Sequence, residues 1–157
     1  MKSLKKVLTV MVLFISVFVL TGCGKKEPIT YGTFHSKLSD KGFRVVDVGE
    51  QFENYSSIKK AYVAQSKDAT YQIEYYELVD NDAAQAFFDN NKNIFLESIG
   101  NVSKSRLDVT KKEYARFHVT SKGYYFFLSR NKNTVIYARV TESHKSDVVS
   151  ITKELGY

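Results

Sequence analysis

Aromatic and cationic side chains recur near the C-terminal end of the sequence, where they alternate along three short segments. In a β-strand, residues two apart point to the same side, so each segment can place a ring beside a positive charge. Rings beside guanidinium groups can stack on sugars, peptides or planar ligands, and arginine pairs with carboxylates. The candidate binding residues are Arg116, His118, Tyr125, Phe127, Tyr137 and Arg139.

Sequence signatures of catalysis are absent: the chain has no G-x-S-x-G, H-E-x-x-H or C-x-x-C motif and no glycine-rich phosphate loop. The three histidines, His35, His118 and His144, fall on different predicted elements without metal-ligand spacing. Residues 80–82 lack the glycine and closing glutamate of a calcium loop and are more typical of a helix N-terminus. We therefore expect no catalytic residue, no metal and no cofactor, although a serine–histidine–aspartate site can be assembled from distant residues.

Two predicted hairpins would bring the candidate binding residues onto one face of a sheet. A two-residue turn at residues 122–123 pairs His118 with Phe127. A three-residue loop at residues 131–133 then pairs Phe127 with Tyr137. A slip of one residue in either hairpin would move every side chain of that strand to the other face. The two registers agree, so we expect the six candidate binding residues to share one face.

The opposite face of the same three strands is predicted to be the core. It would carry Ala115, Phe117, Val119, Phe126, Leu128, Ile136 and Ala138. The aromatic–cationic face has two interpretations. It is a binding surface if it is exposed, whereas it consists of ordinary strand residues if a helix covers it. The sequence leaves both alternatives open.

The remaining pattern supplies the elements that must position these residues. Strands are predicted over residues 43–48, 62–66, 70–79, 105–109, 113–121, 124–130 and 134–140. Helices are predicted over residues 30–41, from residues 80–82 to Gly100, and from near Ser143 to Gly156. Strands and helices are segregated rather than alternating, which favours an α+β fold. We expect an antiparallel, bent sheet of about five to seven strands with three helices, an arrangement similar to the Mog1/PsbP-like fold.

The only cysteine, Cys23, follows a positively charged start and an apolar run over residues 7–20. As a helix this run would extend roughly 21 Å, which is short for a bilayer core of about 30 Å and typical of a secretory signal. The segment Leu20-Thr21-Gly22-Cys23 resembles the lipobox of bacterial lipoproteins. In that class the cysteine sulfur receives a diacylglycerol and the chain is cut just before the cysteine. The resemblance implies that Cys23 is a membrane anchor, with palmitate-type acyl chains.

The resemblance divides the chain into three parts. Residues 1–22 would be a lipoprotein signal peptide, residues 23–29 the lipidated cysteine with a short tether, and residues 30–157 one α+β domain. Cleavage would lower the net charge from +6 to +3, because three lysines leave with the signal. The other charges are interspersed, which argues against nucleic acid as a partner. The six residues that follow Cys23 would reach only about 20 Å and hold the domain close to the membrane.

These observations predict a lipoprotein on the cell membrane that faces outside the cytoplasm. In size and general sequence character, rather than in any motif, the mature chain resembles small lipoproteins of Gram-positive-type bacteria. This resemblance implies no particular activity. The expected partners are membrane lipid through Cys23 and an envelope polymer, peptide or protein. We expect a binding module rather than an enzyme, because the one constellation found is aromatic and cationic. The alternative is a small extracytoplasmic hydrolase without a recognisable motif.

Overall fold

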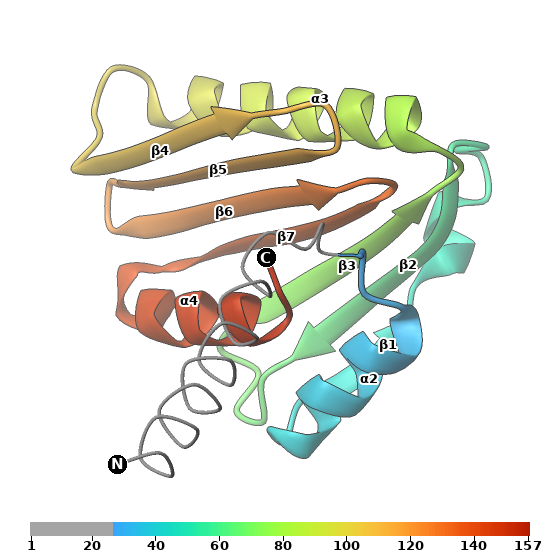
Figure 1. Cartoon of the computed structure of the whole chain (residues 1–157). Helices are drawn as coiled ribbons and strands as arrows, with labels where there is room; N and C mark the ends of the chain where they lie inside the picture. The colour runs from blue at the N-terminus through green and yellow to red at the C-terminus, as the bar shows by residue number, and fades with distance from the viewer. Residues whose placement is uncertain (1–26) are drawn as a thin grey trace, which may run out of the picture.

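The computed structural model describes residues 27–157 as a seven-stranded sheet with helices packed against both of its faces (Figure 1). The helices are α2 (Tyr31–Asp40), α3 (Asn81–Ile99) and α4 (Lys145–Glu154). The strands are β1 (Arg44–Asp47), β2 (Ile58–Gln65), β3 (Gln72–Leu78), β4 (Ser105–Thr110), β5 (Tyr114–Ser121), β6 (Tyr124–Asn131) and β7 (Thr134–Thr141). Two short 3-10 turns, η1 (Gly49–Phe52) and η2 (Glu142–His144), complete the chain. The fold is α+β, as the segregation of helices and strands predicts.

The strand order is β1-β2-β3-β7-β6-β5-β4, and each neighbouring pair is antiparallel. One neighbouring pair, β3 and β7, is not consecutive in the chain. From β3 the chain continues through helix α3 to β4, at the far edge of the sheet. This order makes β7 a central strand, flanked by β3 on one side and β6 on the other. Any site at the border of β3 and β7 therefore combines residues that are distant in the sequence.

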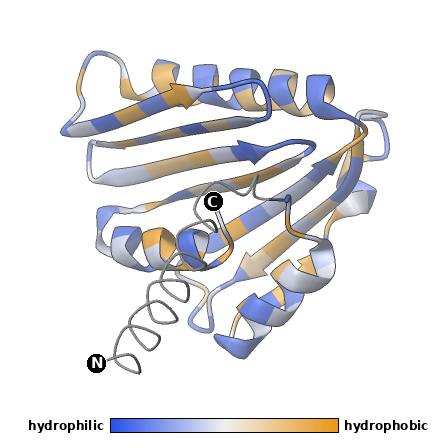
Figure 2. Ribbon diagram, in the orientation of Figure 1, coloured by the Kyte–Doolittle hydropathy of each residue, from blue (hydrophilic) through white to orange (hydrophobic). Residues whose placement is uncertain are grey.

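Helix α3 covers one face of the sheet. It begins at Asp80, whose carboxylate accepts a hydrogen bond from the amide of Ala83 at 2.8 Å, and it ends at Gly100, which adopts φ +61°. Its apolar side chains alternate with polar ones, which Figure 2 shows as orange and blue bands along the helix. Phe95 packs its ring 4.9 Å from Phe126, so the helix is held on β6 by aromatic contacts.

Helices α2 and α4 cover the other face. Phe34 and Leu38 of α2 are fully buried there, and so is Val148 of α4. The C-terminal Tyr157 is buried in the same cluster, and its hydroxyl hydrogen-bonds with that of Thr134. Both faces of the central strands are therefore interior. None of the helices between residues 27 and 157 is long and apolar enough to cross a membrane.

Most predicted elements are present at nearly the predicted positions. Helix α2 begins after Thr30, which caps it by accepting a hydrogen bond from the amide of Thr33. The β5–β6 hairpin turns at residues 122–123 and has the predicted register, with His118 opposite Phe127. Strand β2 is longer than predicted, because it begins at Ile58 rather than at residue 62.

The predicted register of the β6–β7 hairpin is wrong by one residue. Asn131 is the last residue of β6 and pairs directly with Thr134, which leaves a two-residue turn in place of the three-residue loop. Phe127 therefore faces Ala138, and Leu128 faces Tyr137. This slip moves every side chain of β7 to the face opposite the predicted one. Of the predicted core residues, Ile136 and Ala138 consequently lie on the α2–α4 face and the other five lie on the α3 face.

Candidate binding site

The register of β7 divides the six candidate binding residues between the two faces of the sheet. Arg116, His118, Tyr125 and Phe127 lie on the face that α2 and α4 cover. Tyr137 and Arg139 lie on the face of α3. The prediction that all six residues share one face is therefore wrong, and its cause is the β6–β7 turn.

The group on the α2–α4 face is largely interior. Tyr125 and Phe127 are buried, and Arg116 and His118 are half-buried beside them. The Arg116 guanidinium lies 5.8 Å from the centre of the Phe127 ring, and the His118 ring lies 5.8 Å from that of Tyr125. This geometry is a packed aromatic–cationic cluster rather than an open surface.

Burial shapes the ionisation of this cluster. It lowers the pKa of His118, and the nearby charges of Arg116 and Lys145 lower it further. Burial also raises the pKa of Tyr125 to about 12, against a smaller opposing effect of Arg116. Both groups are therefore neutral at pH 7, and the cations of the cluster are Arg116 and Lys145.

The two residues on the α3 face line an open groove. The groove has a volume of about 340 Å³ and is lined by Gln65, Ala69, Thr70, Tyr71, Gln72, Glu74, Tyr137 and Arg139. No residue of α3 lines it, so it occupies a part of the sheet face that the helix leaves uncovered. Tyr137 is half-buried, with its ring 5.0 Å from that of Phe95 on one side and the groove on the other.

The groove forms where two central strands separate. The pairing of β3 with β7 runs from Glu77 opposite Thr134 to Glu74 opposite Tyr137, and it ends there. In the same register Gln72 would lie level with Arg139, but these two residues do not pair. The groove is therefore a gap in the ladder between β3 and β7, which we call the seam.

Glu74 is the carboxylate of the groove, and its oxygens are already bound. The side-chain amide of Gln72 donates to Oε1 at 2.8 Å, and the hydroxyl of Tyr76 donates to Oε2 at 2.5 Å. The burial of Tyr76, together with the adjacent Glu74 carboxylate, raises the pKa of this hydroxyl, so it stays a donor. Glu74 is thus held in place by the sheet, and no cation among residues 27–157 is paired with it.

Arg139 is the cation of the groove, and it is exposed. Its guanidinium lies 5.4 Å from the ring centre of Tyr124 and 5.6 Å from that of Phe126. Among residues 27–157 no carboxylate lies within ion-pair distance of Arg139, and residues 1–26 contain no acidic side chain. The charge of Arg139 is therefore available to a ligand, and the rings below it hold the planar group in place.

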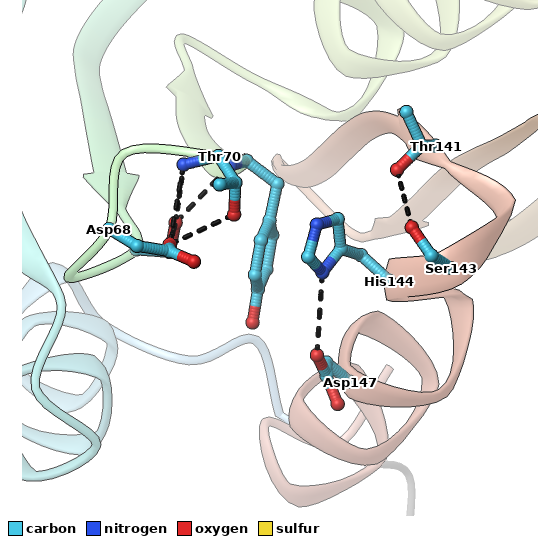
Figure 3. A network of polar contacts seen from close by, with 8 residues as sticks. Asp68, Thr70, Thr141, Ser143, His144 and Asp147 are labelled. Atoms are coloured by element: carbon cyan, nitrogen blue, oxygen red, sulfur yellow. Dashed lines mark hydrogen bonds and ion pairs between the residues drawn. The ribbon is translucent and has the colours of Figure 1, made fainter.

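A second cleft lies on the other side of the seam, between the β2–β3 turn and α4 (Figure 3). Tyr71, which lines both cavities, stacks on His144 at 4.5 Å. Nδ1 of His144 lies 3.7 Å from Asp147. Asp68 accepts hydrogen bonds from Ser66 and Thr70, and these bonds lower the pKa of its carboxyl. Asp68 and His144 thus have polar partners close to them in the sequence.

The described residues hold no pairing of a hydroxyl nucleophile with a histidine base. No hydrogen bond joins a hydroxyl to His35, His118 or His144 anywhere in residues 27–157, and the Ser143 hydroxyl beside His144 is bonded to Thr141 (Figure 3). The same part of the chain has no group of three or more histidine, cysteine, aspartate or glutamate residues that could hold a metal. The alternative of a small extracytoplasmic hydrolase stays a prediction.

Sequence reasoning missed the β3 half of the groove. Glu74 and Gln72 carried no signal in the sequence, because only the pairing of β3 with β7 brings them beside Tyr137. The predicted lipidation site, Cys23, lies outside the described residues, as does the predicted signal peptide. Both stay predictions.

Comparison of the chain with protein-family models, with curated proteins and with solved structures found no match. The similarity to the Mog1/PsbP-like fold therefore stays a prediction, while the α+β class is observed directly.

Proposed function

We propose that this protein is a membrane-anchored, extracytoplasmic binding module. In this proposal Cys23 carries the lipid anchor, and the groove at the seam binds a negatively charged polymer of the cell envelope. The lipobox-like segment Leu20-Thr21-Gly22-Cys23 supports the anchor. The contacts of Arg139 support the binding role.

The observation that carries the binding role is the exposed guanidinium of Arg139, which no carboxylate among residues 27–157 pairs with. Gln72 and Tyr76 already donate to the oxygens of Glu74, so the charged group of the groove that is left to bind a ligand is the Arg139 guanidinium. Arginine forms paired hydrogen bonds with carboxylates and phosphates. A carboxylate- or phosphate-bearing ligand therefore fits this groove better than a cationic one does.

The rest of the lining favours a polar polymer over a protein partner. Gln65, Thr70 and Gln72 contribute amide and hydroxyl groups, which can hydrogen-bond with a hydroxylated chain. The hot spots of protein interfaces are large side chains that fill well-packed, fully desolvated pockets, whereas this groove is open. Tyr137 is half-buried, because Phe95 of α3 packs beside its ring. The part of the ring that lines the groove is left for a ligand.

Co-sedimentation of the full-length protein, in detergent, with an insoluble envelope-polymer fraction tests the binding role. Arg139→Gln should weaken binding about tenfold or more, as the loss of a central interface arginine commonly does. The matched control is Arg106→Gln, because Arg106 is also exposed and lies 5.5 Å from a ring, that of Phe117, but outside the groove. Equal loss in both variants, or no loss in Arg139→Gln, would contradict the assignment of the groove.

A further inference from the structure

Two turns at one end of the sheet are held together by a single buried side chain. Arg130 is fully buried, and its Nη2 donates to the carbonyl oxygens of Lys111 at 2.9 Å and of Lys112 at 3.1 Å. Its Nη1 lies 3.4 Å from the carbonyl oxygen of Lys132. The amide of Lys132 also donates to the carbonyl of Glu113 at 2.7 Å. The β4–β5 turn and the β6–β7 turn therefore form one unit that carries three lysines.

The start of the described chain lies beside this unit. The Glu27 carboxylate forms an ion pair with the ammonium of Lys132 at 2.6 Å. Two residues later, the carbonyl of Ile29 accepts a hydrogen bond from the hydroxyl of Tyr75 at 3.1 Å. Cys23 precedes Glu27 by four residues, which span at most about 14 Å of extended chain. A lipid on Cys23 would therefore bring this end of the sheet to the membrane.

The β4–β5 turn carries two adjacent lysines at this end. Lys111 and Lys112 are exposed, and neither forms an ion pair with any residue from 27 to 157. Lys25 and Lys26 add two charges in the tether. Of the acidic groups at this end, Glu27 is paired with Lys132, Glu113 has a partner and Asp80 caps α3, while the exposed Asp82 lies beside Asn133.

We propose that the lysine turns, which carry Lys111, Lys112 and Lys132, face the membrane, with Lys111 and Lys112 against the phosphate groups of anionic phospholipids. This proposal rests on the lipid anchor at Cys23 and adds an orientation to it. Each lysine near an anionic membrane surface strengthens attraction roughly fivefold. Arg130 contributes indirectly, because its hydrogen bonds hold the backbone of both turns and so keep the lysines together at one end of the sheet. The groove, at the other end of β7, then faces away from the membrane.

Site-specific labelling of the lipidated full-length protein in vesicles tests this orientation. Acylated Cys23 would leave no free thiol, so an introduced cysteine is the only labelling site. Thr110→Cys places a fluorophore next to the lysine turns, and Lys67→Cys places one on the exposed β2–β3 turn at the opposite end. A quencher attached to lipid headgroups reports which label touches the membrane.

In vesicles that contain phosphatidylglycerol, the label at position 110 should be quenched several-fold more than the label at position 67. Pure phosphatidylcholine vesicles, or Lys111→Gln/Lys112→Gln in the Thr110→Cys background, should reduce the quenching at position 110. Equal quenching at the two positions would overturn the proposal. So would quenching at position 110 that is the same in both kinds of vesicle and in the variant without the two lysines.

Detergent-phase partition and the mass of the Cys23 peptide separate this proposal from the anchor. A protein that partitions into detergent and carries the lipid, but shows no quenching at position 110, contradicts the orientation alone. A protein without the lipid, in the aqueous phase, contradicts the anchor and the orientation together, and it leaves the groove assignment to its own binding test.

Discussion

Replacing Arg130 with methionine should destabilise the protein strongly, although no acidic partner would be lost. Arg130 is the one fully buried charged side chain among residues 27–157. No carboxylate in that part of the chain forms an ion pair with it, and Asp89 acts on it only at longer range. Burial lowers its pKa, and backbone carbonyls of two turns supply its hydrogen bonds.

The size of the effect follows from these contacts. Hydrogen bonds that involve a charged group contribute roughly 1.5–3 kcal/mol each, so two good bonds from Nη2 are worth about 3–6 kcal/mol. Arg130→Met removes the guanidinium and also relieves its burial, including that of Nε, which has no hydrogen-bond partner. The exposed turns let water reach the freed carbonyls. We therefore expect a net loss of about 2–4 kcal/mol in the free energy of unfolding.

Urea unfolding followed by circular dichroism would measure this loss. With a slope of about 2 kcal/mol per molar urea, the midpoint should fall by roughly 1–2 M. Arg130→Lys is the matched control, because one ammonium cannot bond to both turns as the forked guanidinium does, so its loss should be intermediate. A change below about 1 kcal/mol in Arg130→Met would refute the view that this side chain holds the two turns together.

Three further predictions concern the core, pH and the anchor. Phe126→Ala should cost about 3–5 kcal/mol of stability, because the ring is buried against Phe95; a loss under about 1 kcal/mol would remove it from the core. The pKa of His118 is lower in the folded protein, so stability should fall as pH drops below about 6.5, and His118→Gln should flatten this slope; an unchanged slope would contradict it. Cys23→Ser should move the folded protein out of the detergent phase, and continued lipid-dependent partition would exclude the lipobox interpretation.

The β5–β6 register could be predicted because its turn chemistry is distinctive. Gly123 adopts φ +79° and Lys122 adopts φ +51°, as a tight two-residue hairpin turn requires, and glycine signals such a turn in the sequence. At the next hairpin the residue with positive φ is Lys132, at +49°, and lysine carries no such signal. The asparagines on both sides of Lys132, Asn131 and Asn133, instead favour a three-residue loop in the sequence.

The apolar pattern could not correct this error. A slip of one residue is normally revealed because it sends polar side chains into the core. Strand β7 is covered on both faces, and Val135, Ile136, Ala138 and Val140 are all buried. A strand that is buried on both sides reads as a continuous apolar run, which fits either register equally well. The assignment of Tyr137 and Arg139 to a face therefore depended entirely on the turn.

The groove depends on a longer-range feature. It exists because β3 and β7, which are separated in sequence by α3 and three strands, pair only as far as Glu74 and Tyr137. Local propensity governs hairpin turns and helix caps, and the caps and the β5–β6 hairpin were predicted well, unlike the β6–β7 hairpin. The meeting of β3 with β7 is a property of the whole sheet, and no local pattern in residues 72–78 encodes it.

Strand β7 connects the two proposals, since it runs from one to the other. It begins at Thr134, directly after the lysine turn, and five residues later Arg139 lies in the groove, about 17 Å away along the strand. A tether of at most about 14 Å beyond Glu27 holds the lysine turns close to the membrane, and in the proposed orientation the groove lies farther from it. If Cys23 carries the lipid and the domain has this orientation, the ligand of Arg139 comes from the envelope space rather than from headgroups of the anchoring membrane.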